Sequence, residues 1–182
     1  MKLRYLIPVV VFIVLFGFFV VVLRRPDYNP SQIASPLLGK PAPVYELASV
    51  EDPTAKVASR DFASKFHLVN VWATWCVECR HEHAMLLDIQ RQNVVPIVGI
   101  DWNDNLADAQ RWLSTLGNPY VATAFDGQGR TALDWGVYAA PESFLVDDKG
   151  VIRCKQTGGI TPHDWETKFL PVIRGQQAGV CK

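Results

Sequence analysis

The hydrophobic residues of the chain lie first in one uninterrupted run and then in shorter, separated segments. Residues 6–23 form the run, which has eighteen positions and no charged side chain. Lys2 and Arg4 precede it, and Arg24 and Arg25 follow it. Since about 20 apolar residues span the hydrocarbon core of a bilayer, the run predicts an N-terminal transmembrane helix.

Two other structures are compatible with this run. A cleaved signal peptide has an apolar region of roughly 7 to 15 residues followed by a small-residue cleavage site, whereas Arg24-Arg25-Pro26-Asp27 follows here. A helix buried in a core is the second alternative. We expect an uncleaved membrane anchor over residues 1–25. Basic residues on both sides give a slight preference for a cytoplasmic N-terminus, and we expect the remainder of the chain to be exported.

Beyond the anchor, the composition changes twice. Residues 26–38 contain Pro26, Pro30 and Pro36 among Asn, Ser and Gln, which predicts an extended tether. From residue 39 onward, apolar segments alternate with turn residues. We therefore expect a folded domain over residues 39–182.

The first half of this domain has the pattern of a strand, a helix and a second strand. Residues 67–75 are rich in Val and Trp, and residues 94–102 form another nearly continuous apolar run. Such runs are typical of parallel strands that are covered on both faces. Residues 76–92 lie between them with helical spacing of Met85, Leu86 and Ile89. Residues 105–116 predict a second helix, which Gly117 ends.

The second half predicts an antiparallel pair and a last helix. A loop from Phe125 to Gly129 and an apolar segment over 133–138 precede residues 143–146 and 151–156, which flank a turn at 147–150. Thr161-Pro162 predicts the start of a helix with a hydroxyl cap. The fold class is therefore α/β, with a mixed central sheet and helices on both faces.

The charge of the chain excludes one class of function. Lys and Arg together number 18, as do Asp and Glu, so that the formal net charge is zero. Beyond the membrane flanks, the sequence has no stripe of basic residues. We expect no nucleic-acid partner.

Two cysteines stand where the first predicted strand passes into the first helix. Backbone N–H groups at a helix start favour a thiolate, which makes Cys76 the expected nucleophile. Cys79 follows three residues later on the same helical face, about 5 to 6 Å away between Cβ atoms. It is the expected resolving thiol, and Cys76 and Cys79 form a candidate redox-active disulfide.

Other uses of such a cysteine pair are weaker alternatives. Haem attachment requires a His directly after the second cysteine, and Arg80 stands there. Zinc could recruit His81 or His83, which we expect at the surface, but a structural zinc site normally has a second spaced pair. A peroxidase uses a separately placed resolving cysteine.

The segments around these cysteines resemble the thioredoxin superfamily, and more narrowly the membrane-tethered thiol:disulfide interchange proteins of cytochrome c maturation, the CcmG/DsbE group. The resemblance covers residues 38–174. It rests on Asn70-Val71-Trp72-Ala73-Thr74-Trp75-Cys76, Cys79-Arg80-His81-Glu82-His83, Leu116-Gly117-Asn118-Pro119-Tyr120 and the stretch from Gly136 to Leu145. It implies a thioredoxin-like fold with an inserted helix.

The same resemblance implies a substrate-binding surface. Pro141 corresponds to the cis-proline that faces the dithiol, and Ala140 offers backbone groups to a bound substrate strand. Trp75, directly before the nucleophile, lines the substrate surface. Cis peptide bonds are nearly confined to X-Pro bonds and are a minority even there, so this assignment comes from the family.

The chain departs from related sequences in two places. Val77 and Glu78 stand between the cysteines, where many relatives have a proline, and we expect Glu78 to raise the thiol pKa values by like charge. Thioredoxin has a buried acid at the position of Asn70, and an amide cannot exchange the proton of Cys79. Glu142, beside Pro141, and Glu82, three residues beyond Cys79, are the candidate proton acceptors.

The function that the resemblance implies is a reductase on the periplasmic side of a bacterial inner membrane. Its electrons would come from a membrane thiol transporter, and its substrate would be apocytochrome c or a cytochrome c maturation thiol protein. No organic cofactor or metal is expected. A general extracytoplasmic thiol reductase or peroxidase is the alternative, followed by a non-catalytic metal-binding chaperone.

Two cysteines lie outside this motif. Cys154 and Cys181 can form a second, structural disulfide in an oxidising compartment, or each can be buried or free. The sequence leaves these alternatives open.

Overall fold

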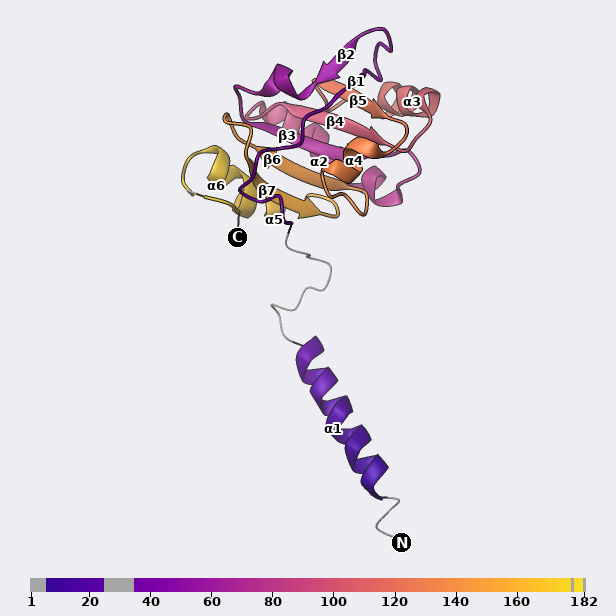
Figure 1. Ribbon diagram of the computed structural model, residues 1–182, viewed down its shortest axis with the longest axis vertical. Helices are drawn as coiled ribbons and strands as arrows, with labels where there is room; N and C mark the ends of the chain where they lie inside the picture. The colour runs from indigo at the N-terminus through magenta and orange to yellow at the C-terminus, as the bar shows by residue number, and fades with distance from the viewer. Residues whose placement is uncertain (1–5, 25–34, 178, 182) are drawn as a thin grey trace. The chain divides into compact units, whose positions relative to one another are not determined.

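The computed structural model describes residues 6–24, 35–177 and 179–181, and divides into two units, Met1–Ile33 and Ala34–Lys182 (Figure 1). The first unit contains one helix, α1 (Leu6–Leu23). Among the described residues, no helix combines the length and the apolar character needed to cross a membrane. The predicted transmembrane helix is therefore present as a helix but is not confirmed as a membrane span. Most of the predicted tether, residues 26–34, lies outside the described residues.

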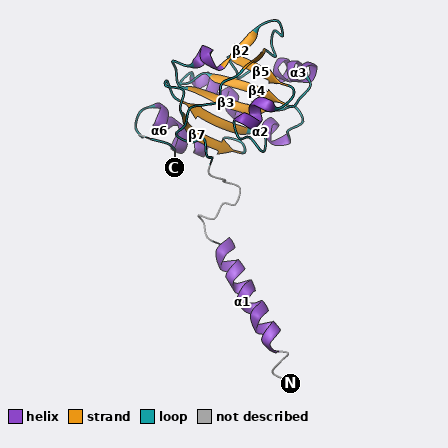
Figure 2. Ribbon diagram, in the orientation of Figure 1, coloured by secondary structure: helices purple, strands orange, loops and turns teal. Residues whose placement is uncertain are grey.

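The second unit is built on a five-stranded mixed sheet with the strand order β5-β4-β3-β6-β7 (Figure 2). The central strand β3 pairs in parallel with β4 and antiparallel with β6. The edge strand β5 is parallel to β4, and β7 is antiparallel to β6. The strands are β3 (His67–Trp72), β4 (Ile97–Trp102), β5 (Ala122–Asp126), β6 (Glu142–Val146) and β7 (Ile152–Thr157).

Side chains alternate between the two faces of this sheet, so each strand contributes to two cores. One core joins Leu68, Ile97 and Leu145 to apolar residues of α2, α3 and the C-terminal helices. The other joins Val69, Val71 and their neighbours to α4 and to a small hairpin. The helices are α2 (Val77–Gln92), α3 (Leu106–Leu116), α4 (Arg130–Asp134), α5 (Pro162–Asp164), a π-helical turn η3 (Trp165–Phe169) and α6 (Leu170–Ile173).

The small hairpin consists of β1 (Glu46–Ala48) and β2 (Lys56–Ala58), followed by the 3-10 helix η2 (Ser59–Phe62). Before it, Leu37 and Leu38 pack against the second core. The last residues of the predicted tether thus contact the folded unit.

The predicted α/β fold and thioredoxin-like sheet are confirmed, but several details of the prediction are wrong. Residues 122–126 form the edge strand β5, whose last two residues fall in the expected loop. A short helix, α4, includes the first two residues of the apolar segment expected at 133–138. The last helix is divided by a π-helical turn instead of running continuously.

A second disulfide joins Cys154 to Cys181, with 4.9 Å between the Cα atoms. Cys154 lies in β7 and is fully buried, opposite Leu145 of β6. The backbone N–H of Cys181 donates to the carbonyl oxygen of Arg153 at 2.8 Å. The disulfide therefore fastens the C-terminal segment to β7, close to the end of the sheet where β3 begins and away from Cys76.

We predict that Cys181→Ala lowers the free energy of unfolding by about 3 kcal/mol, because a disulfide that closes a loop of this size restricts the unfolded chain by roughly that amount. Urea denaturation of the oxidised protein measures the change. The rate of thiol–disulfide exchange at Cys76 should stay the same in this variant. A loss below about 0.5 kcal/mol would show that the C-terminal disulfide does not stabilise the fold.

Candidate active site

The redox pair lies at the start of α2. Cys76 is the N-cap residue, with extended backbone angles, and its Sγ accepts a hydrogen bond from the backbone N–H of Cys79 at 3.0 Å. The two residues form a disulfide with 5.3 Å between their Cα atoms, and both are buried. The nucleophile position therefore receives one of the N–H groups that a helix start leaves unpaired, which stabilises a thiolate.

The loop before Cys76 is held by the segment that follows β4. Asp104 accepts hydrogen bonds from the backbone N–H and from the hydroxyl of Thr74, the latter at 2.7 Å. The indole N–H of Trp75 donates to the carbonyl oxygen of Asn103 at 3.0 Å. The Trp75 side chain packs edge-on against Trp102, yet it is 53% exposed. An exposed aromatic surface thus adjoins the disulfide.

The peptide bond between Ala140 and Pro141 is cis, as the family resemblance implied. The next residue, Glu142, pairs with Val71 of β3, so this bond lies beside the end of β3 that leads to Cys76. Ala140 packs against the core that contains both cysteines. The roles of Trp75, Ala140 and Pro141 in binding substrate stay predictions.

Glu82 is buried beneath the start of α2. One carboxylate oxygen accepts from the backbone N–H of Ile160 at 2.8 Å, and the other accepts from the Asn70 amide at 3.2 Å. Burial raises its pKa to about 7, and the charge of Glu78 acts in the same direction. Both hydrogen bonds favour the carboxylate and oppose this shift. Glu82 therefore exchanges a proton near neutral pH.

The Asn70 amide is the centre of a buried polar network. Besides Glu82, its N–H group donates to the hydroxyl of Ser143 at 2.9 Å, and its oxygen accepts from the hydroxyl of Tyr120 at 2.8 Å. Tyr120 and Ser143 both belong to segments that carry the family resemblance, but the sequence does not predict their contacts with Asn70. The amide fixes the position of Glu82 without adding a second buried acid.

Glu142 lies on the other face of the sheet. It pairs with Val71, which belongs to the core opposite α2, whereas its neighbour Ser143 points toward Asn70. Its carboxylate forms a buried ion pair with Lys155 at 2.8 Å. Burial raises the pKa of Glu142, and Lys155 opposes this effect. The structure therefore separates the two candidate acids, and only Glu82 lies on the cysteine side of the sheet.

The two histidines after Cys79 differ from each other. His81 is exposed and lies 3.5 Å from the carboxylate of Glu78. His83 is buried, so the expectation of a surface position is wrong for this residue. Its Nε2 lies 3.0 Å from the Gly117 carbonyl oxygen, and its Nδ1 accepts from the indole of Trp112 at 3.3 Å. Among residues 6–24, 35–177 and 179–181, no group of three possible ligands could hold a metal ion.

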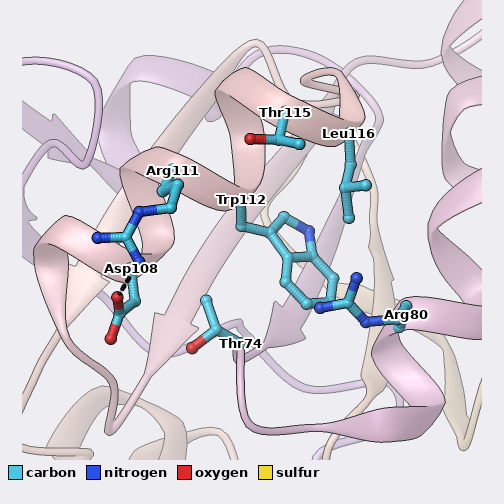
Figure 3. A pocket seen from close by; sticks show the side chains of 7 residues that line it. All are labelled: Thr74, Arg80, Asp108, Arg111, Trp112, Thr115 and Leu116. Atoms are coloured by element: carbon cyan, nitrogen blue, oxygen red, sulfur yellow. Dashed lines mark hydrogen bonds and ion pairs between the residues drawn. The ribbon is translucent and has the colours of Figure 1, made fainter.

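A hollow of about 300 Å³ is lined by residues of α3 and by Thr74 and Arg80 (Figure 3). Thr74 and Arg80, which flank the two cysteines in the sequence, form one side, and α3 forms the other. The Arg80 guanidinium lies 4.3 Å from the centre of the Trp112 ring. The hollow also contains Arg111, paired with Asp108 at 2.8 Å.

Comparison with known proteins identifies the family. Residues 37–169 match the family model described as Redoxin. The thiol:disulfide interchange protein DsbE of Allochromatium vinosum is 38% identical over 176 residues, which cover 97% of this chain and 96% of that protein. This chain belongs to the DsbE family. It is therefore a thiol:disulfide oxidoreductase.

Other members of the DsbE family are similarly close. The DsbE protein of Escherichia coli K12 is 39% identical over 173 residues, covering 92% of this chain and 91% of that protein. A crystal structure of a putative DsbE from Chlorobium tepidum has 26% identity and a TM-score of 0.63, covering 71% of this chain and 90% of that one. The thioredoxin-like fold of this DsbE family member is thus shared with a solved relative.

The raised pKa of Glu82 predicts a pH-dependent stability. The folded state keeps the proton up to about pH 7, whereas the ordinary pKa is 4.5, so the free energy of unfolding should fall as the pH rises between these values. Glu82→Gln removes this dependence. The free energy of unfolding of the variant, minus that of wild type, should therefore be about 3 kcal/mol larger at pH 8 than at pH 4.

Urea unfolding of the oxidised proteins over this pH range measures the difference. Glu166→Gln is the matched control, because Glu166 is exposed and is not among the groups that shift the pKa of Glu82. If the difference in the free energy of unfolding between Glu82→Gln and wild type does not change with pH, the raised pKa of Glu82 is contradicted.

Proposed function

We propose that this protein is a reductase of cytochrome c maturation. Its substrate is either the disulfide formed by the haem-attachment cysteines of apocytochrome c or the disulfide of a partner thiol protein. The observation that carries the proposal is the N-cap position of Cys76, with a donor on its sulfur and a buried acid of raised pKa beneath the same helix start. Membership of the DsbE family supports the thiol:disulfide chemistry.

The proposed reaction begins with both cysteines reduced. The thiolate of Cys76 attacks one sulfur of the substrate disulfide, which forms a mixed disulfide and releases the other substrate sulfur as a thiolate. Cys79 then loses its proton and attacks the Cys76 sulfur. The second substrate thiolate leaves, so the substrate gains two electrons and Cys76 and Cys79 are oxidised.

Glu82 is the group that we assign to the proton of Cys79. It follows Cys79 by three residues on α2, so both side chains lie on one helical face. Its carboxylate accepts from the backbone N–H of Ile160, a residue of the core that contains both cysteines. A base is most effective when its pKa is close to the working pH. Glu142 lies on the opposite face of the sheet and is held by Lys155, and we do not assign it this role.

The substrate surface would consist of Trp75, Ala140 and Pro141. Trp75 offers an exposed ring beside the disulfide. Ala140, next to the cis peptide bond, could pair its backbone groups with an extended substrate segment. These contacts would place a substrate sulfur opposite Cys76.

We further propose that the redox domain faces the periplasm and that residues 1–25 attach it to the bacterial inner membrane, with a membrane thiol transporter as the electron donor. The support is the uncharged run of residues 6–23 between basic flanks. Separation of membrane and soluble fractions tests the attachment. The full chain should remain with the membrane, and a chain without residues 1–25 should be released.

Trapping the mixed disulfide tests the proposed substrate. In Cys79→Ala the resolving thiol is missing, so the reduced variant should accumulate a covalent complex with a peptide that contains an oxidised Cys-x-x-Cys-His segment. Cys76→Ala is the matched control and should form none. Equal trapping of unrelated peptide disulfides would instead indicate a general thiol reductase.

The role of Glu82 predicts a kinetic effect. In Glu82→Gln, resolution of the mixed disulfide at neutral pH should slow by about 100-fold, since general-base catalysis typically contributes at least that much. The rate should also lose its dependence on a group of pKa about 7. Stopped-flow measurement of peptide release gives the rate.

Glu142→Gln is the comparison for this kinetic test. It should alter the resolution rate far less, although loss of its ion pair with Lys155 should destabilise the fold. If Glu142→Gln slows resolution and Glu82→Gln does not, the proton assignment is wrong.

A further inference from the structure

A second buried acid lies near the redox pair and has no role in the reaction described above. Asp101 is in β4, where it pairs with Trp72 of β3 on one side and with Phe125 of β5 on the other. Its side chain has no exposed surface. It follows Ile100 and precedes Trp102 in a strand that is otherwise apolar except for Gly99.

Strand alternation places Asp101 on the face that α2 and α3 cover. Val98 and Ile100 belong to the core on the α4 side, and Ile97 belongs to the core that contains the cysteines. A Cβ atom at Gly99 would meet Trp72 and Tyr120 on that face. Asp101, two residues further along, therefore occupies a core position at the end of the strand that leads to the active site.

The carboxyl group of Asp101 lacks a donor that would stabilise a negative charge. Neither oxygen receives a hydrogen bond within the described part of the chain. The charged or titratable groups that act on it are Asp104, after the same strand, and Asp126 of β5, and it acts in turn on Tyr120. Burial, reinforced by the Asp104 carboxylate, raises the pKa of Asp101 to about 9. Asp101 is therefore a neutral acid at pH 7.

A neutral carboxylic acid has an O–H group to donate. Asp104 is the charged side chain that acts on it most strongly. Trp72 pairs with Asp101 in the sheet, and Thr74, two residues after Trp72, donates to Asp104. Two carboxyl groups can share a hydrogen bond only when one of them carries a proton. Asp104 also accepts from Thr74 twice and from the backbone N–H of Asn105 at 2.7 Å. Asp104 thus joins the buried acid to the loop before Cys76.

We propose that Asp101 is a positioning residue of the active site: its protonated carboxyl group donates to Asp104 and thereby fixes the carboxylate that holds Thr74, two residues before the nucleophile. The adjacent Asn103 carbonyl holds Trp75 in the same loop. When Asp101 loses its proton, two carboxylates face each other, and in the described part of the chain no cation is among the groups that act on Asp101. The hydrogen bonds from Thr74 to Asp104 then weaken. Cys76, two residues after Thr74, is held less firmly in its position.

NMR titration of the oxidised full-length protein in detergent tests this directly. The side-chain carboxyl carbon of Asp101 should titrate with a midpoint of about 9, and the backbone amide resonance of Thr74 should shift with the same midpoint. The oxidised form is used because its two active-site sulfurs do not titrate. A midpoint for Asp101 near its ordinary value of 3.8, or a Thr74 resonance that does not follow it, would overturn the proposal.

Two variants distinguish positioning from simple packing. Asp101→Asn keeps a donor toward Asp104 at every pH and has nearly the same volume, whereas Asp101→Leu keeps the branching at Cγ but is larger and has no donor. The second-order rate of the reduced enzyme with a peptide disulfide should fall about 10-fold in Asp101→Leu, since small displacements of reacting groups are costly. Asp101→Asn should recover most of that rate, and its Thr74 resonance should not shift near pH 9.

Equal rates in the two variants would show that the donor is unimportant and would overturn the proposal. If Asp101→Leu does not fold, the wild-type titration and the Asp101→Asn spectrum still decide the outcome. The proposal is independent of the identity of the physiological substrate, because the titration uses no substrate.

Discussion

The hydrogen bond from the Cys79 backbone N–H to the Cys76 sulfur is the interaction on which the chemistry depends. It exists because α2 begins directly after Cys76, so that the first turn has N–H groups without helical partners. The β3 strand ends just before this point, and its register with β4 and β6 sets where the helix starts. The sheet therefore delivers the nucleophile to the positive end of a helix.

Three groups of contacts surround the redox-active cysteines, and each stabilises a different part of the active site. The segment after β4 holds Thr74 and Trp75 before the nucleophile. The cis peptide bond at Pro141 lies beside the end of β3. Below, the Asn70 network holds Glu82. Burial raises the pKa of Glu82 to about 7 and that of Asp101 to about 9. Near neutral pH, Glu82 therefore exchanges a proton, whereas Asp101 keeps its proton.

The parts of the structure that were predictable have strong local signals. The apolar runs of β3 and β4, the helical spacing after Cys76 and the turn at 147–150 each follow from neighbouring residues alone. The spacing of Cys76 and Cys79 alone predicts that they form a disulfide. The cis bond at Pro141 needed the family resemblance, since most X-Pro bonds are trans.

The features that were missed depend on residues far apart in the chain. The strand β5 is formed through its pairing with β4 rather than by its own sequence, which has few large apolar residues. Strand register decides that Glu142 faces away from the cysteines, and the packing of α3 buries His83. Asp101 is the one charged residue in a predicted buried strand, which marks it as unusual in the sequence alone. The sequence does not predict that it acts together with Asp104.

The reduction potential of the Cys76–Cys79 pair tests the central claim most directly, because direction of electron flow follows from it. Equilibration of the full-length protein with glutathione and dithiothreitol buffers, followed by quantification of thiols, gives the value. A reductase requires a potential nearer that of thioredoxin, roughly −270 mV, than that of the oxidant DsbA, roughly −120 mV. A potential close to the oxidising value would contradict the account and would assign the protein to disulfide donation.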